Sequence, residues 1–201
     1  MSGDGEPSPL GAGAASAALA GLVVSSAALV SAPRLMPPSY SWLAHTTSES
    51  AAQGVPGAWL ARAGFLLLGC CVIVIAVVRR ARWGRWGVGL HAAFGALMIA
   101  TGIFSARPWE PGLPFSPVED LLHSVAATSL GFAFAVGVVL VAWRHWRDTG
   151  AWRLLDVTAV TASVVLPLAM LGFEPLTGAL QRVMFLLAYL WYGREACSRP
   201  Q

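Results

Sequence analysis

The chain has 201 residues, of which 56% are hydrophobic and only 11% are charged. A soluble domain carries roughly 25% charged residues, so this chain lacks the polar side chains needed to cover a water-exposed surface. Disorder is excluded as well, because a disordered chain combines low hydrophobicity with high charge. The composition therefore predicts an integral membrane protein whose main partner is the lipid bilayer, and we expect no nucleic-acid partner despite the net charge of +3.

Six apolar stretches follow one another, each close to the 17–25 residues that cross a hydrocarbon core of roughly 30 Å. Their continuous apolar character favours helices over the alternating pattern of β-barrel strands. The sequence thus predicts an all-α, polytopic bundle of six transmembrane helices, with one domain at 10–193 and tails at 1–9 and 194–201. The predicted spans are Leu10–Ala32, Ala58–Val78, Trp86–Ser105, Leu121–Trp143, Leu154–Phe173 and Leu176–Trp191.

The first span is rich in small residues, which let helices approach closely, so we expect it to pack inside the bundle. A secretory signal has a positively charged segment before its apolar core, whereas only Asp4 and Glu6 carry charge before this span. We therefore expect a retained helix, with a cleaved signal peptide as the alternative.

The loop after the first span is long for a connection in a compact domain, and long ordered loops are often functional. If residues 41–53 form a short helix, His45 and Glu49 lie one turn apart on one face. The alternative is a surface loop that Tyr40 and Trp42 anchor at the membrane interface.

The loop between the third and fourth spans contains four prolines, which keep it irregular and stiff. Ser116 and Pro117 predict the start of a helix, and Glu119 and Asp120 in its first turn suit the helix dipole. His123 lies one turn deeper. A carboxylate one turn away can orient its imidazole or share a metal ion with it.

Two arginines lie below the expected membrane surface, Arg62 in the second span and Arg182 in the sixth. An arginine inside a membrane almost always pairs with another group. We expect an internal ion pair with Glu49, Glu119 or Asp120, or contact with an anionic or lipid-like small molecule.

All 13 basic residues are arginines, and short arginine-rich loops stay in the cytoplasm. Nine of them lie in the segments that follow the second, fourth and sixth spans, which places these segments and both termini on the cytoplasmic side. We therefore expect a multi-pass protein of the cytoplasmic membrane. The nine are Arg79, Arg80, Arg82, Arg85, Arg144, Arg147, Arg153, Arg194 and Arg199.

On this cytoplasmic side the sequence offers few candidates for chemistry. We expect His91 to hydrogen-bond a neighbouring helix, and Asp156 to pair with Arg153 or with the helix dipole. The opposite side holds the candidate ligand-binding residues Arg62, Arg182, His45, Glu49 and Glu119. Candidate catalytic residues there are His123 and Asp120, and candidate zinc ligands are His45, Glu49, Asp120 and His123.

Three short patterns stand out along the chain: Tyr40-Ser-Trp with Ser48-Glu-Ser and Gly57-Ala-Trp-Leu, then Val118-Glu-Asp-Leu-Leu-His, then Leu180-Gln-Arg-Val-Met-Phe. They resemble the first loop, fourth span and last span of a bacterial and archaeal membrane family, catalogued as domain of unknown function 998. The resemblance covers the chain after its N-terminal tail and implies six helices and a membrane location, but no activity. Family members often carry Glu where this chain has Gln181. The arginine-only, alanine-rich composition is typical of a high-GC actinobacterium.

Three functions stay open at this point. A non-catalytic membrane component would satisfy every polar group internally. A binding or transport protein would enclose a pocket in which Arg182 faces an anionic or lipid-like ligand, with Pro167 kinking the fifth span. The alternative to both is a metal-dependent hydrolase, with zinc-activated water attacking a lipid-like substrate at the outer interface.

Overall fold

The computed structural model describes residues 9–198, and within that range it contains helices and no strand. The predicted N-terminal tail lies outside the described residues except for Pro9, which begins the first helix. The long helices are α1 (Pro9–Ser31), α2 (Trp59–Val78), α3 (Arg80–Ile103), α4 (Pro117–Thr149), α5 (Leu154–Gly172) and α6 (Thr177–Cys197). Three single turns of 3-10 helix are η1 (Ala32–Leu35), η2 (Glu49–Ala51) and η3 (Glu174–Leu176).

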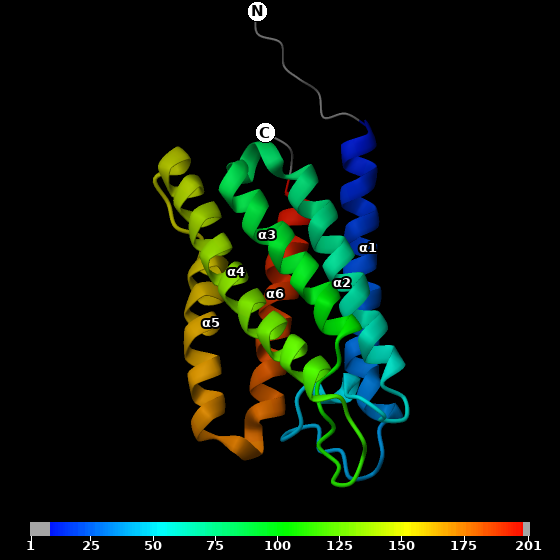
Figure 1. Ribbon diagram of the computed structural model, residues 1–201. Coiled ribbons are helices and arrows are strands. Elements are labelled where there is room, and N and C mark those ends of the chain that lie inside the picture. The colour runs from blue at the N-terminus through cyan, green and yellow to red at the C-terminus, as the bar shows by residue number, and fades with distance from the viewer. Residues whose placement is uncertain (1–8, 199–201) are drawn as a thin grey trace, which may run out of the picture.

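The six long helices run antiparallel in chain order and form one bundle (Figure 1). The end where α1 begins and α6 finishes also holds the α2–α3 and α4–α5 connections, and we call it the terminal end. The opposite end, called the loop end, holds the loops 32–58 and 104–116 and the turn into α6. The arginine-rich connections therefore share the terminal end, as their spacing predicts.

Five of the six helices, α1 to α5, are long and apolar enough to cross a membrane. The sixth lies outside that group because polar residues interrupt it, among them Gln181, Arg182, Arg194 and Glu195. It nevertheless belongs to the interior of the bundle, since Trp191 and Tyr192 have no exposed surface. The structure thus shows six helices, of which five are membrane-spanning by composition.

Three helices extend well beyond the predicted apolar spans, and one of them, α6, ends at Cys197, six residues later than predicted. α3 begins at Arg80, six residues earlier than predicted, and Gly84 interrupts it with a φ of 67°. α4 continues to Thr149 and ends at Gly150, whose left-handed conformation is a common helix terminator. Apolarity marks only the lipid-covered part of a helix, whereas caps decide where the backbone stops. At about 1.5 Å per residue, the 33 residues of α4 make about 50 Å, and the helix crosses the bundle diagonally (Figure 1).

The first three helices pack through small residues. A side chain on Gly95 of α3 would place its Cβ only 2.7 Å from the carbonyl oxygen of Gly69 on α2. The Ser25 hydroxyl of α1 donates to the Gly64 carbonyl at 2.7 Å. However, α1 lies at the edge of the bundle and not inside it, because Val23 and Val30 are 64% and 67% exposed. Its small residues serve close contact on one face only.

An aromatic cluster fills the terminal half of the bundle. The His91 ring lies 4.5 Å from the Trp83 ring and 4.7 Å from the Trp191 ring, measured between centroids. Its Nδ1 lies 2.9 Å from the Tyr192 hydroxyl of α6. The prediction that His91 hydrogen-bonds a neighbouring helix is confirmed.

Beside this cluster, buried charges join α5 to α6. Arg153 donates from Nε to Asp156 at 2.6 Å and from Nη1 to Glu195 at 2.8 Å. The indole nitrogens of Trp83 and Trp191 donate to Glu195 and Asp156, each at 2.9 Å. The expected Asp156–Arg153 pair is present, but Glu195 makes it a network that also reaches α3.

Removing Glu195 should destabilise the bundle strongly. The substitution Glu195→Ala leaves the Arg153 charge and the Trp83 indole without their buried acceptor, and breaking a buried ion pair costs about 3–5 kcal/mol. We expect a large fall in melting temperature of the purified protein in detergent, followed by tryptophan fluorescence. The matched control is Arg194→Ala, which removes a 40%-exposed side chain 4.0 Å from Asp156 and should change little. Equal melting temperatures for the two variants would contradict the network's role.

Candidate functional site

The two arginines predicted at membrane depth both donate hydrogen bonds to the backbone of the first loop. Arg62 donates to the carbonyl oxygens of Ala51 and Ala52, each at 3.0 Å. Arg182 donates from Nη1 to the carbonyl oxygens of Trp42 and His45, at 2.7 and 2.9 Å. The predicted ion pair with Glu49, Glu119 or Asp120 is wrong for both arginines, because backbone carbonyls take the place of the carboxylates. An irregular loop leaves backbone carbonyls unpaired, and these carbonyls supply the acceptors instead.

Tyr40 completes the attachment of Arg182. Its hydroxyl accepts from Arg182 Nη2 at 2.6 Å and donates to the carbonyls of His45 and Thr46, at 3.2 and 2.9 Å. Burial raises the pKa of the Tyr40 hydroxyl, although the neighbouring guanidinium partly opposes this rise. The hydroxyl therefore keeps the proton that it donates to the loop backbone.

His45 and Glu49 do not share a helical face, because residues 41–53 form turns with only the short η2 helix. His45 Nδ1 accepts from the Ser41 backbone nitrogen at 2.9 Å. Glu49 accepts from the backbone nitrogen and the hydroxyl of Thr46, at 2.6 and 2.8 Å. Side chains of this kind compete with the helix for backbone groups, so each residue fixes its own turn.

The second group of candidates holds the segment that follows α3. α4 begins as predicted, with Ser116 as N-cap and proline in its first turn. Three side chains of α4 each bind one backbone group of the segment: Glu119 and Asp120 from its first turn and His123 from the next turn. Their partners are the backbone nitrogens of Ser105 and Arg107 and the carbonyl oxygen of Phe104, at 2.8, 2.8 and 2.9 Å respectively. These side chains hold the segment after α3 against the start of α4.

The seven predicted residues thus all lie at the loop end, but their side chains hydrogen-bond to groups of the loops and not to one another. Among the described residues, no three His, Cys, Asp or Glu side chains lie close enough together to hold a metal ion. The zinc hypothesis therefore finds no geometric support in this part of the chain. Five of the seven fix two loops on the ends of α2, α4 and α6, and the other two, His45 and Glu49, fix turns within the first loop.

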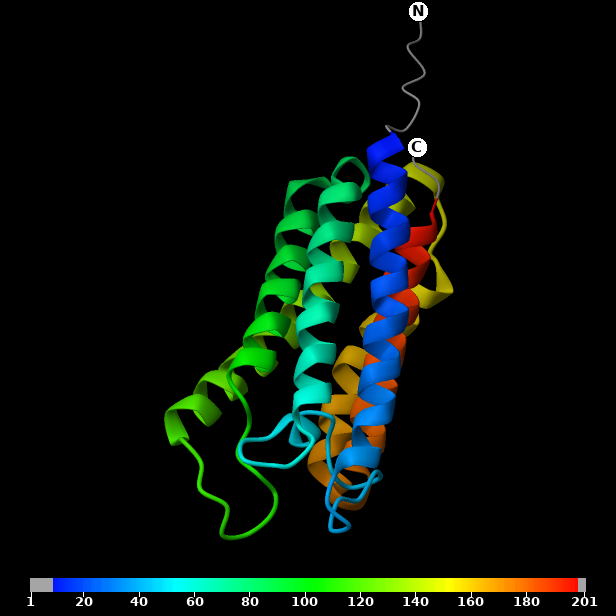
Figure 2. The same ribbon diagram turned by 90° about the vertical axis from the view of Figure 1, so that its right-hand side faces the viewer.

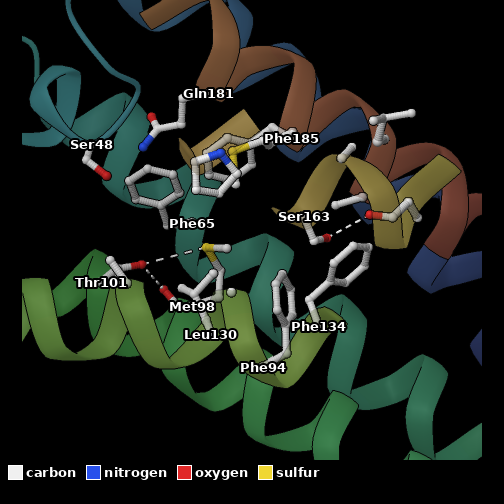
Figure 3. A pocket seen from close by; sticks show the side chains of 18 residues that line it. Ser48, Phe65, Phe94, Met98, Thr101, Leu130, Phe134, Ser163, Gln181 and Phe185 are labelled. Carbon is white, nitrogen blue, oxygen red and sulfur yellow. Dashed lines mark hydrogen bonds between the residues drawn. The ribbon is translucent and has the colours of Figure 1, made fainter. Parts of the chain in front are cut away.

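Beneath these loops, a cavity of about 140 Å³ lies between α3, α4, α5 and α6, with one side chain from α2 and one from the first loop (Figure 3). Aromatic rings flank it in two pairs, with centroid distances of 5.8 Å and 5.7 Å. Among residues 9–198, no charged side chain lines it. The aromatic and methionine side chains that line it are Phe65, Phe94, Met98, Phe134, Met184 and Phe185.

The wall that α5 contributes is packed loosely. Only Asp156 and Ala159 of this helix are buried, and Leu168 is 62% exposed. Pro167 lines the cavity and removes one backbone hydrogen bond from the helix. α4 and α5 meet at the terminal end and diverge toward the loop end in both views (Figures 1 and 2). The cavity therefore lies where α4 and α5 separate from each other.

Sequence reasoning did not find this cavity. Pro167 and Gln181 were singled out separately, but the phenylalanines and methionines of the lining are indistinguishable from ordinary core residues in an apolar span. Two features hint at the cavity after the fact: α5 carries a mid-helix proline, and Gln181 is a polar residue facing an apolar interior.

Comparison with known proteins places the chain in one family. No curated protein and no solved structure matches it significantly. The family described as "Protein of unknown function (DUF998)" matches residues 17–194, which is most of the chain. The suspected resemblance is confirmed, and the chain is a member of the DUF998 family.

Proposed function

We propose that this protein is a six-span protein of the bacterial cytoplasmic membrane that binds the apolar chain of a lipid-like molecule between α3, α4, α5 and α6. The observation that carries the proposal is the cavity, which is apolar, free of charged side chains and bordered by a loosely packed helix. The seven candidate residues of the loop end support the wall of that site and do not themselves line it.

The packing of α6 against its neighbours supports the proposal that it is the sixth membrane span. α6 lies antiparallel beside α5 and contacts α1, and both of these helices are apolar enough to cross a membrane. A bilayer that surrounds α1 and α5 therefore surrounds α6 as well. Its polar residues are tolerated because protein groups satisfy them, as Arg182 and Glu195 show. The arginine-rich terminal end supports a cytoplasmic location for both termini.

The cavity suits part of a hydrocarbon chain. An engineered apolar cavity of about 150 Å³ stays dry and binds benzene, so an apolar space of this size favours hydrocarbon over water. Its volume encloses only a short segment of a long chain. The remainder would lie along the diverging halves of α4 and α5, where Phe132 and Leu168 are 69% and 62% exposed. Lateral entry from the bilayer follows from this arrangement.

Filling the cavity should weaken binding. A Cβ added at Gly131, which lines the cavity, meets no atom within 4 Å, so Gly131→Leu inserts its side chain without a backbone clash. In nanodiscs, we expect labelling of the cavity peptides by a photoreactive long-chain alkane to fall about tenfold, because overpacking a site costs about 1–3 kcal/mol. Gly89→Leu is the matched control, since Gly89 is equally unobstructed but exposed outside the cavity. Equal labelling of both variants and the wild type would sink the proposal.

The orientation of the protein in the membrane can be tested by chemical labelling of a native cysteine. Cys197 is exposed at the end of α6, whereas Cys70 and Cys71 lie within α2. A membrane-impermeant maleimide should label Cys197 in inside-out vesicles and not in intact spheroplasts. The reverse pattern is expected for Arg107→Cys in a Cys197→Ser background, because Arg107 is exposed at the loop end. Labelling of Cys197 from outside would refute the cytoplasmic assignment of the terminal end.

A further inference from the structure

The cavity carries polar groups at its loop end, where Ser48 and Gln181 lie together (Figure 3). Ser48 comes from the first loop, and Gln181 comes from the second turn of α6, one residue before Arg182. The rest of the lining is almost entirely apolar. A pair of polar side chains at one end of such a cavity is a feature that packing alone does not require.

Gln181 is held so that its amide nitrogen is available. The backbone nitrogen of Thr47 donates to Gln181 Oε1 at 2.7 Å. Only the amide oxygen can accept this bond, so the orientation of the amide group is fixed and the nitrogen is left with its two hydrogens. Among the described residues, neither this nitrogen nor the Ser48 hydroxyl has a hydrogen-bond partner. In Figure 3 the Gln181 nitrogen points toward the space between Ser48 and Phe65.

The other hydroxyl groups that line the cavity already donate hydrogen bonds to backbone carbonyls. Thr101 donates to the Met98 carbonyl at 2.8 Å, and Ser163 donates to the Ala159 carbonyl at 2.7 Å. The nearest positive charge along the chain, Arg182, is engaged by the loop backbone. The cavity therefore offers two open hydrogen-bond donors at one end and no cation to neutralise an anion.

We infer that this site selects a lipid-like molecule with an uncharged carbonyl oxygen, which accepts hydrogen bonds from Gln181 and Ser48 while its chain occupies the apolar part. The inference rests on the proposed function and adds the chemistry of the ligand's polar end. A carboxylate is disfavoured because a buried charge needs a paired partner, and a plain alkane leaves both donors unpaired. Long-chain esters and lipid-soluble quinones both carry such an oxygen.

Competition against the photoreactive alkane tests the inference on the full chain in nanodiscs. The competitors are a long-chain methyl ester, the alkane of equal length, the corresponding fatty-acid carboxylate and an isoprenoid quinone. We expect the ester to compete about 3–10-fold better than the alkane, which is the range for one net hydrogen bond, and the carboxylate to compete worst. Whether the quinone matches the ester tells which source of carbonyl the site prefers.

Two substitutions separate the donors from the fold. Gln181→Glu keeps an oxygen for the Thr47 backbone nitrogen but replaces the donor nitrogen with an acceptor. Ser48→Ala removes a hydroxyl that has no described partner, so it should leave folding intact even if the first variant does not fold. Each should lower the preference for ester over alkane, because one of the two donors is lost, while alkane labelling persists. Ser163→Ala is the matched control, because its hydroxyl is already bonded, and it should keep the preference.

The outcomes distinguish this inference from the proposed function. Equal competition by ester and alkane in the wild type, or a preference that survives both Gln181→Glu and Ser48→Ala, overturns the inference and leaves a purely apolar binding site. Absence of any labelling of the cavity peptides in the wild type overturns the proposed function and the inference together.

Discussion

The structure depends on the internal satisfaction of polar groups in a bundle whose outer surface is apolar. At the loop end, Arg62 and Arg182 bind carbonyl oxygens that irregular backbone leaves open. At the terminal end, Arg153 binds two buried carboxylates, one from its own helix and one from α6. Lipid offers no hydrogen bonds in place of these, so each arginine must find its acceptors within the protein. Both ends of the bundle are therefore fixed by arginine.

This arrangement leaves the middle of the bundle free of charge. The arginines and carboxylates that could act on a ligand are used to hold loops and helix ends, and they lie outside the cavity lining. What remains available is an apolar space with a short polar edge. The proposed binding of a lipid-like molecule draws on this space and not on the charged residues.

The helix α5 gives the cavity its accessible side. Its terminal end is bound to α6 through Asp156, Arg153 and Glu195, whereas most of its remaining length faces outward. A helix held firmly at one end and packed loosely along the other is suited to admit a chain from the bilayer. Pro167 lies in the loosely packed part, where a missing hydrogen bond weakens the helix locally.

The sequence by itself determined the membrane class, the helical architecture, the shared side of the arginine-rich connections and the family. These follow from composition, apolar length and charge position, which are properties of each segment on its own. The start of α4 at Ser116 and the bond of His91 to a neighbouring helix were likewise predictable. The limits of α3, α4 and α6 were not, because caps and a glycine turn override the apolar pattern.

Only the tertiary structure decided what the polar residues do. Residue spacing suggested that His45 and Glu49 converge, but each binds its own turn, and Arg182 binds backbone that no sequence pattern identifies as open. The cavity and the partner of Glu195 were also decided there. The physical reason is that lipid-facing, core-facing and cavity-facing positions of a membrane helix are all apolar, so only the packing of helices distant in sequence tells them apart.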